Sequence, residues 1–279
     1  MAVIRTNKWI QLFLKHADSQ RELESTYLRL FVNPLQPLFQ FQNDEQLAAY
    51  LQKVGLFTVN DREQLPAFID HDYWSILQAQ FLKLKQAWNG PNVPIYVLMA
   101  NQSLENRQDD VRGMMGLSFE NGILLLIPSS IEHNHLRALL THEYHHVCRL
   151  SHTKESEQSI TLLESMVMEG LAELAVKEYV GESSIAPWAL KQKSNWKTMW
   201  NQYLFEKTLV IKGRKEHKDF LYGSRKKRIP YMMGYTLGYC LCQEAALQLG
   251  EKSVTLLTTP AEKIYRHGYI ENGFKNNEP

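Results

Sequence analysis

The chain has 279 residues, of which 44% are apolar, and a formal net charge of +1 at neutral pH. This length and apolar content suffice for a hydrophobic core in one large domain or two small ones. The nearly balanced charge argues against nucleic acid or a membrane surface as a partner. No run approaches the ~20 apolar residues that a membrane span requires.

The cysteines and the N-terminus bear on the compartment. Three cysteines are too few for a disulfide framework, and Cys148 is expected to be a buried thiol. Residues 1–16 have an interrupted apolar pattern, without the long apolar stretch or the small-residue cleavage site of a signal peptide. We therefore expect a cytoplasmic protein.

The first ninety residues predict helices, over about residues 18–33, 44–55 and 71–88. Asn43, followed by two acidic residues, is a typical N-cap for the second helix, which Gly55 ends. The third helix ends at residues 89–91, which read NGP. We expect residues 1–92 to form a helical N-terminal extension and residues 93–279 to form the main domain, both packed as one compact unit.

The pattern then changes from helix to strand. A short β-prone run, Ile95–Met99, is followed by a polar linker over residues 101–110. Two further runs, residues 113–119 and 123–127, flank Glu-Asn-Gly, and Asn-Gly between such runs is a strong hairpin signal. We expect a small antiparallel sheet here.

From residue 131 onward the pattern is mostly helical. The expected helices cover about residues 131–150, a segment ending at Gly181, a Trp-rich segment near 187–205, and about 232–249. Together with the hairpin they predict an α+β protein that is mostly helical.

The most informative motif is residues 142–146, which read HEYHH, a complete H-E-x-x-H signature inside a predicted helix. Residues four apart lie on one helical face, so His142 and His146 can bind one metal ion together. Glu143 lies beside that ion, where it can take a proton from water. Glu143 also falls within the apolar arc of the helix, where a carboxylate is costly unless a cation compensates it. An ordinary amphipathic helix with two histidines at the core edge is the alternative.

A catalytic zinc site usually needs a third protein ligand. His152 has the spacing of H-E-x-x-H-x-x-G-x-x-H, but Arg149 stands where that pattern requires glycine. Glu169, in residues 168–173 (MEGLAE) on the next predicted helix, completes a site of two histidines and one glutamate. Gly170 is expected to let the two helices approach closely. We expect Glu169 to be the third ligand.

Three stretches together carry a resemblance to a known family: residues 141–150, 167–173 and 230–239, which read THEYHHVCRL, VMEGLAE and PYMMGYTLGY. They resemble the YjaZ-type family of bacterial predicted zinc-dependent proteases and, more broadly, the gluzincin metallopeptidases, over about residues 111–260. The resemblance implies a gluzincin-like peptidase fold, with residues 93–279 as the peptidase domain. It also implies one Zn²⁺ per chain and a peptide or protein substrate, but no particular substrate.

Peptide hydrolysis also needs a donor for the developing oxyanion, and enzymes of the gluzincin type often use a tyrosine. Tyr231, Tyr235 and Tyr239 recur every four residues on one predicted helical face, where two of the three are expected to be core. Tyr235, with glycines one and three residues away, is the predicted donor, and Tyr231 is second. His217 is a further alternative.

Two features have two interpretations each. Residues 203–230 carry nine Lys and Arg against three Asp and Glu, and this run is either a solvated loop or a flap or exosite for an acidic partner. Nucleic-acid binding is disfavoured there, because no stacking aromatics are interleaved with the charge. Glu173 either orients a ligand or is an exposed helix charge.

The sequence therefore predicts a zinc-dependent peptidase in which His142, His146 and Glu169 bind zinc and Glu143 is the general base. The hairpin before the zinc helix either pairs with extended substrate or only packs on helices. The competing hypothesis is a non-catalytic, peptidase-like binding or chaperone-like module, which would have no need of Glu143.

Overall fold

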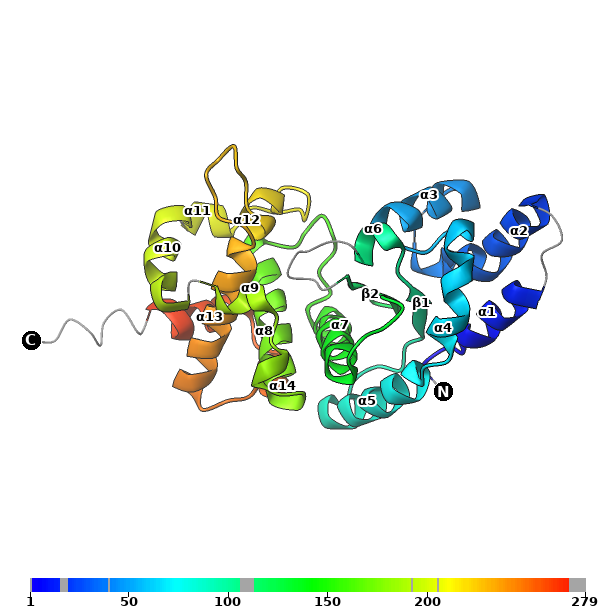
Figure 1. Ribbon diagram of the computed structural model, residues 1–279. Helices are drawn as coiled ribbons and strands as arrows, with labels where there is room; N and C mark the ends of the chain where they lie inside the picture. The colour runs from blue at the N-terminus through cyan, green and yellow to red at the C-terminus, as the bar shows by residue number, and fades with distance from the viewer. Residues whose placement is uncertain are drawn as a thin grey trace, which may run out of the picture. The chain divides into compact units, whose positions relative to one another are not determined.

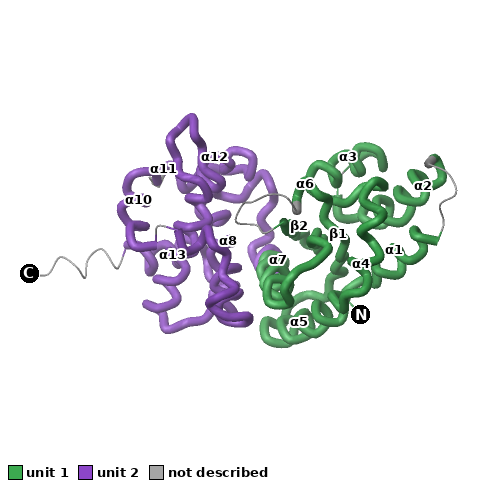
Figure 2. The backbone as a smooth tube through the Cα atoms, viewed as in Figure 1, with its two compact units in different colours: residues 1–147 green, residues 148–279 purple. Residues whose placement is uncertain are grey.

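The computed structural model describes residues 2–15, 20–39, 41–105, 113–191, 193–204 and 206–270. The chain divides into two compact units, residues 1–147 and 148–279 (Figure 2). The division falls inside helix α7 (His133–Thr153), which is continuous. It does not follow the boundary expected between residues 92 and 93, and a separate peptidase domain over residues 93–279 stays a prediction.

Unit 1 contains a three-stranded sheet of β1 (Ile95–Met99), β2 (Met115–Phe119) and β3 (Gly122–Ile127), in the order β1-β3-β2 (Figure 1). The predicted hairpin is confirmed, because β2 and β3 are antiparallel and Phe119 pairs with Gly122 at the turn. All six residues of β3, the central strand, are buried.

The prediction of a purely antiparallel sheet is wrong, because β1 pairs with β3 in parallel, with Val97 opposite Leu125. A parallel pair needs a long crossover connection. The connection from β1 to β3 contains α6 (Gln102–Glu105), which lies within the expected polar linker. It also contains β2, which pairs with the opposite edge of β3. Residues 106–112 lie outside the described part of the chain. A short apolar run does not by itself specify the direction of its neighbours.

Five α-helices of unit 1 precede the sheet in the described part of the chain: α1 (Thr6–Lys15), α2 (Gln20–Tyr27), α3 (Asp44–Val54), α4 (Leu65–Ile69) and α5 (Tyr73–Trp88). The second and third predicted helices are confirmed as α3 and α5. The side chain of Asn43 accepts a hydrogen bond from the backbone N–H of Gln46, and Gly55 ends α3 with φ of 116°.

The first predicted helix is shorter in its α-helical part than expected. After α2 the chain continues as a π-helical turn, Leu28–Val32, and a 3₁₀ helix, Asn33–Leu38. Pro34 and Pro37 lie in this second part and cannot donate the backbone hydrogen bonds of a regular α-helix.

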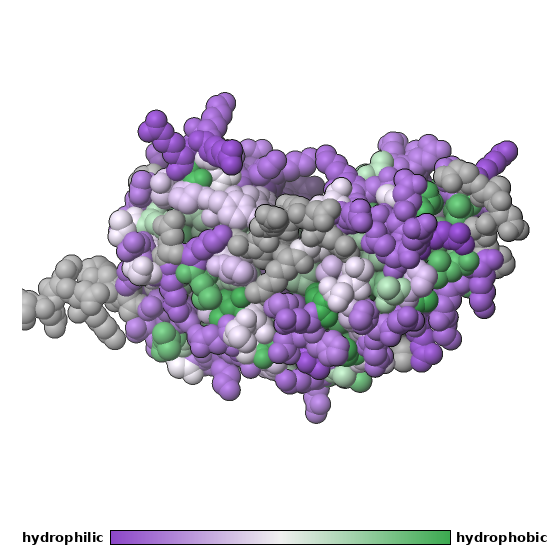
Figure 3. All heavy atoms as spheres, viewed as in Figure 1, coloured by the Kyte–Doolittle hydropathy of each residue, from purple (hydrophilic) through white to green (hydrophobic). Residues whose placement is uncertain are grey.

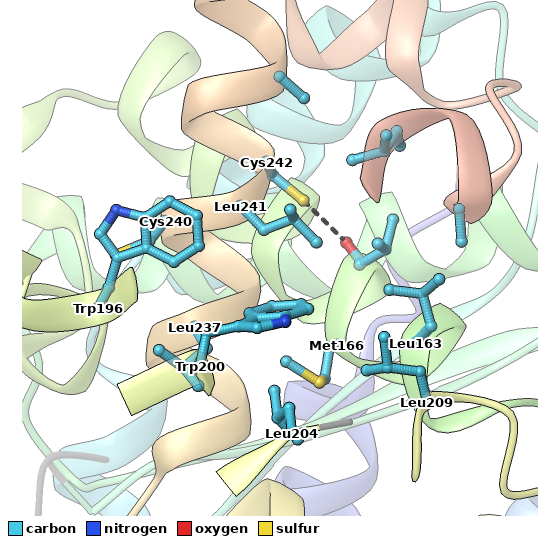
Figure 4. Close-up of a cluster of buried hydrophobic side chains, with 14 of the residues drawn as sticks. Leu163, Met166, Trp196, Trp200, Leu204, Leu209, Leu237, Cys240, Leu241 and Cys242 are labelled. Carbon is cyan, nitrogen blue, oxygen red and sulfur yellow. Dashed lines mark hydrogen bonds between the residues drawn. The ribbon is translucent and has the colours of Figure 1, made fainter. Parts of the chain in front are cut away.

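Unit 2 is helical: it holds the end of α7, then α8 (Leu162–Tyr179), α9 (Pro187–Leu190), α10 (Trp196–Tyr203), α11 (Glu206–Leu209), α12 (Lys218–Tyr222), α13 (Met233–Leu249), α14 (Ser253–Leu256) and α15 (Ala261–Tyr265). Its core lies around α8, α10 and α13, where Met166, Trp200 and Leu237 pack together (Figure 4). The prediction of one continuous Trp-rich helix near residues 187–205 is wrong. A 3₁₀ turn, Lys193–Asn195, separates α9 from α10, since Ser and Asn favour caps over helix interiors.

Helices α8 and α13 cross at two glycines. A Cβ on Gly170 would lie 2.1 Å from the carbonyl oxygen of Gly238, and a Cβ on Gly238 would lie 2.1 Å from that of Met166. The expectation for Gly170 was an approach to the zinc helix. Instead, Gly170 faces α13. The backbones of α8 and α13 are in contact there, so a residue with a side chain would not fit at position 170.

Two general expectations are also answered. Among the described residues, no helix is long and apolar enough to cross a membrane. All three cysteines are buried and unbridged, as expected for Cys148.

Candidate metal centre

Helix α7 places the two motif histidines on one face. The Nε2 atoms of His142 and His146 lie 3.0 Å apart, and their ring planes meet at 88°. His146 is buried, and His142 is partly buried. The spacing of four residues on a helix therefore brings two imidazole nitrogens to one point, as a shared metal ion requires.

One group of possible metal ligands occurs in the described part of the chain: His142, His146 and Glu169. Their ligand atoms all lie within 4.8 Å of one another, and Glu169 is buried. Two imidazole nitrogens and one carboxylate oxygen are a donor set that zinc takes in proteins. His152 is exposed near the end of α7 and is not part of this group.

Glu143 is buried beside strand β2. Its carboxylate accepts a short hydrogen bond from Ser118, whose Oγ also lies 2.9 Å from the carbonyl oxygen of Glu143. A Cβ on Gly116 would lie 2.2 Å from the carboxyl carbon of Glu143, so any larger residue there would displace this carboxylate. No local sequence pattern marks Ser118 and Gly116, because only the fold brings β2 against α7. The hairpin thus packs on the helix, and pairing of β2 with substrate stays a prediction.

Aromatic packing from α5 holds this part of α7 in unit 1. Tyr144 is fully buried between Phe81 and Trp88, at ring-centroid distances of 5.0 and 5.6 Å, and its hydroxyl donates to the carbonyl oxygen of Pro91 at 2.9 Å. His145 is also fully buried and meets the ring of Trp88 edge-on at 5.4 Å. These contacts turn residues 144 and 145 toward α5, and His145 is not a member of the metal group.

Arg149, one helical turn after His146, is fully buried in unit 2. Its Nε and Nη2 donate to the two carboxylate oxygens of Glu164 on α8, at 2.6 and 2.8 Å. Its Nη1 donates to three backbone carbonyls, those of Leu256, Leu257 and Thr259. In the sequence, Arg149 is notable only because it stands where the longer histidine motif requires glycine. In the structure it fixes the end of α7 to the first turn of α8.

The three tyrosines differ in their surroundings. Tyr239 is fully buried, as expected for core. Tyr235 is partly buried and packs against the core, whereas Tyr231 is 54% exposed and lies outside it. The cause is the backbone: α13 begins only at Met233, after Met232 with φ of 55°, and Tyr231 does not share the helical face.

Tyr235 lies on the first turn of α13, with its hydroxyl 3.4 Å from that of Tyr222 on α12. Burial, and then the negative charge of Glu169, raise the pKa of Tyr235 well above its ordinary value. The same two causes raise the pKa of Tyr222. Both phenols therefore keep their protons at neutral pH and can donate hydrogen bonds.

Two other candidates have structural partners. His217 is buried, with Nδ1 3.0 Å from Ser165 Oγ and Nε2 2.8 Å from the carbonyl oxygen of Ile211, and burial lowers its pKa. Both ring nitrogens of His217 are thus engaged inside unit 2. Glu173 is buried and accepts a hydrogen bond from the backbone N–H of Ala186 at 2.9 Å, so it is not an exposed helix charge.

Comparison with known proteins assigns a family. Over residues 73–266 the chain matches a family described as "Predicted Zn-dependent protease (DUF2268)", and this match begins in α5, within the predicted N-terminal extension. The chain is 30% identical over 271 residues to "Uncharacterized protein YjaZ" of Bacillus subtilis (strain 168). The aligned region covers 94% of this chain and 97% of that relative. It is 23% identical over 120 residues to "Uncharacterized protein YjfC" of the same strain, over 40% of each chain. No solved structure gives a significant match.

Proposed function

Because this chain belongs to the YjaZ-type family of predicted zinc-dependent proteases, we propose that it hydrolyses peptide bonds with one zinc ion per chain. The observation that carries the proposal is the convergence of His142, His146 and Glu169, whose ligand atoms lie within 4.8 Å of one another. Their donor set fits zinc, and three protein ligands leave a fourth position open. A zinc ion held there would act as a Lewis acid that polarises a carbonyl group and makes water nucleophilic near neutral pH.

We assign the general base to Glu143. It is adjacent to His142 in sequence but is not a member of the ligand group. The hydrogen bond from Ser118 holds its carboxylate in one orientation. Glu143 accepts the proton of the attacking water and then delivers it to the leaving amine. A buried carboxylate on an apolar helical face is otherwise costly, and this role explains why it is present.

We assign the oxyanion donor to Tyr235. Its phenol keeps its proton at neutral pH, because burial raises the pKa of Tyr235 above its ordinary value. A hydrogen bond from this phenol strengthens as negative charge develops on the carbonyl oxygen, so it favours the transition state over the bound substrate. Tyr222, at 3.4 Å, limits the positions that the Tyr235 hydroxyl can take.

The gluzincin-like fold and the cytoplasmic location belong to the same proposal. A helix with the H-E-x-x-H motif, a following helix with the third ligand, and a strand packed against the general base support the fold. The three unbridged cysteines are typical of a reducing compartment and support the location.

The test is cleavage of a peptide library by the full chain. We expect cleavage that a zinc chelator abolishes and that added zinc restores, together with one zinc per chain by metal analysis. Bound zinc without cleavage of any peptide would contradict the peptidase and favour a binding or chaperone-like module.

A further inference from the structure

A second charged feature lies in unit 2, outside the metal group. Residues 212–228 contain eight Lys and Arg but two Asp and Glu, and four of the basic residues are consecutive, Arg225–Arg228. All four side chains are exposed. In Figure 3, hydrophilic side chains project from the part of unit 2 where Figure 1 shows the loop after α12.

This loop is folded. The backbones of Ser224 and Ile229 exchange two hydrogen bonds of 3.0 and 2.9 Å, and the N–H of Arg228 donates to the carbonyl oxygen of Arg225 at 3.2 Å. At its base, a Cβ on Gly223 would lie 2.3 Å from the carbonyl oxygen of Pro230. Residues 224–229, the basic hairpin, therefore present four cations on a closed turn.

Little of this charge is neutralised by the residues that the structure describes. Lys227 pairs with Asp219 at 2.8 Å, and this contact lowers the pKa of the aspartate. In the described part of the chain, Arg225, Lys226 and Arg228 have no acidic side chain within ion-pair distance. The hairpin therefore keeps three cations exposed for an anionic partner.

The basic hairpin borders the residues assigned to the reaction. It follows Tyr222 directly, and α13 with Tyr235 begins shortly after it; the two hydroxyls are 3.4 Å apart. The N–H of Met232 donates to the carbonyl oxygen of Tyr222 at 3.0 Å. This hydrogen bond joins the residues that precede the hairpin to those that follow it. Arg214, from the same basic run, contacts Met168, the neighbour of Glu169, with Nη2 4.0 Å from the sulfur.

We propose that the basic hairpin is a docking surface for an acidic polypeptide segment, so that the chain prefers substrates with Asp or Glu beside the cleaved bond. The inference rests on the proposed function, because it takes the occupant to be the peptidase substrate. Charge complementarity favours an anion, and the position of the hairpin beside Tyr222 and Tyr235 favours the peptidase substrate over other anions. Lys227 lies over the ring of Phe220 at 5.8 Å and Lys191 over that of Tyr231 at 5.5 Å, so one face of each ring already has a cation.

The test is peptide binding by the full chain with Glu143→Gln, in which we expect cleavage to be slow enough for a binding measurement. Two fluorescent peptides share an apolar centre and differ only in flanking residues, Glu in one and Gln in the other. By anisotropy at low ionic strength, we expect the Glu peptide to bind roughly tenfold more tightly, as a few exposed ion pairs allow. Salt should remove most of this difference, because exposed charges are screened.

The hairpin variant combines Arg225→Gln, Lys226→Gln and Arg228→Asn; asparagine suits the positive φ of 55° at residue 228. The matched control removes the same charge at three exposed lysines elsewhere, by changing Lys53, Lys252 and Lys263 to Gln. We expect the hairpin variant to lose most of the preference for the Glu peptide and the control to keep it.

Equal affinity for the two peptides, or equal loss in the hairpin variant and the control, would overturn the docking surface. Tighter hairpin-dependent binding of a single-stranded oligonucleotide, or of vesicles with anionic phospholipid, would also overturn it and assign the surface to that partner. Cleavage by the chain with Glu143 intact separates the two proposals. Cleavage without preference for Glu removes only the docking surface, whereas binding of the Glu peptide without cleavage of any peptide removes only the peptidase.

Discussion

The residues of the proposed site are held in two different ways. In unit 1, the α7 segment with His142 and Glu143 packs on aromatic rings of α5, with Tyr144 stacked at 5.6 Å on Trp88. In unit 2, buried polar bonds and glycine contacts position α8 and α13, the helices that carry Glu169 and Tyr235. Close packing tolerates conservative replacement, whereas a buried ion pair is very sensitive to the loss of one partner. The two regions should therefore respond differently to mutation.

The largest effect is expected for the base in unit 1. Glu143→Gln keeps the size of the side chain and removes its basicity, so turnover should fall by about 10²–10⁴-fold while the zinc content stays near one. Peptide cleavage and metal analysis measure the two quantities. Glu132→Gln, at an exposed site just before α7, is the control. Equal cleavage by wild type and Glu143→Gln would show that Glu143 is not the base.

The next effect concerns the ligand in unit 2. Glu169→Ala should weaken zinc binding by at least ~10²-fold, because loss of a ligand exceeds the effect of losing an outer partner. His152→Ala should keep the zinc, since His152 is exposed and outside the ligand group. Competition with a chelator measures both affinities. The reverse pattern would transfer the role of third ligand to His152.

The buried ion pair between Arg149 and Glu164 in unit 2 allows a direct test of its sensitivity to the loss of one partner. Arg149→Met leaves the carboxylate of Glu164 buried without its partner, and should lower the free energy of unfolding by about 3–5 kcal/mol. The double variant Arg149→Met with Glu164→Met removes both charges and should recover part of the loss. Recovery is incomplete because the carbonyl oxygens that accept from Arg149 Nη1 also lose their donor. Urea unfolding monitors the stability, and a double variant no better than Arg149→Met would show that the ion pair is not the cause.

The smallest effect is expected at the tyrosines. Tyr235→Phe keeps the ring and its packing, so folding and zinc content should survive while turnover falls by roughly 10–10³-fold, as for other oxyanion donors. Substrate affinity should change less than turnover, because the hydrogen bond strengthens only in the transition state. Tyr239→Phe, at a fully buried position of the same helix, is the matched control. A small and equal effect at Tyr235 and Tyr239 would place the donor elsewhere.

Features that depend only on neighbouring residues could be predicted from the sequence. The H-E-x-x-H spacing brings His142 and His146 together on any helix, because the helical repeat alone sets their direction. The Asn43 cap and the Asn-Gly hairpin are equally local, since their hydrogen bonds close within a few residues. The predictions of the cap and the hairpin were confirmed for that reason.

Contacts between distant segments could not be predicted in this way and are known only from the fold. Ser118 and Gly116 meet Glu143 because β2 packs against α7, and the parallel pairing of β1 with β3 depends on a crossover that no local pattern encodes. Arg149 seemed only a departure from a motif until the fold supplied Glu164 and three backbone carbonyls as its acceptors. Such contacts depend on which elements the buried apolar surface brings together, and helical or strand periodicity specifies a buried face without specifying its partner.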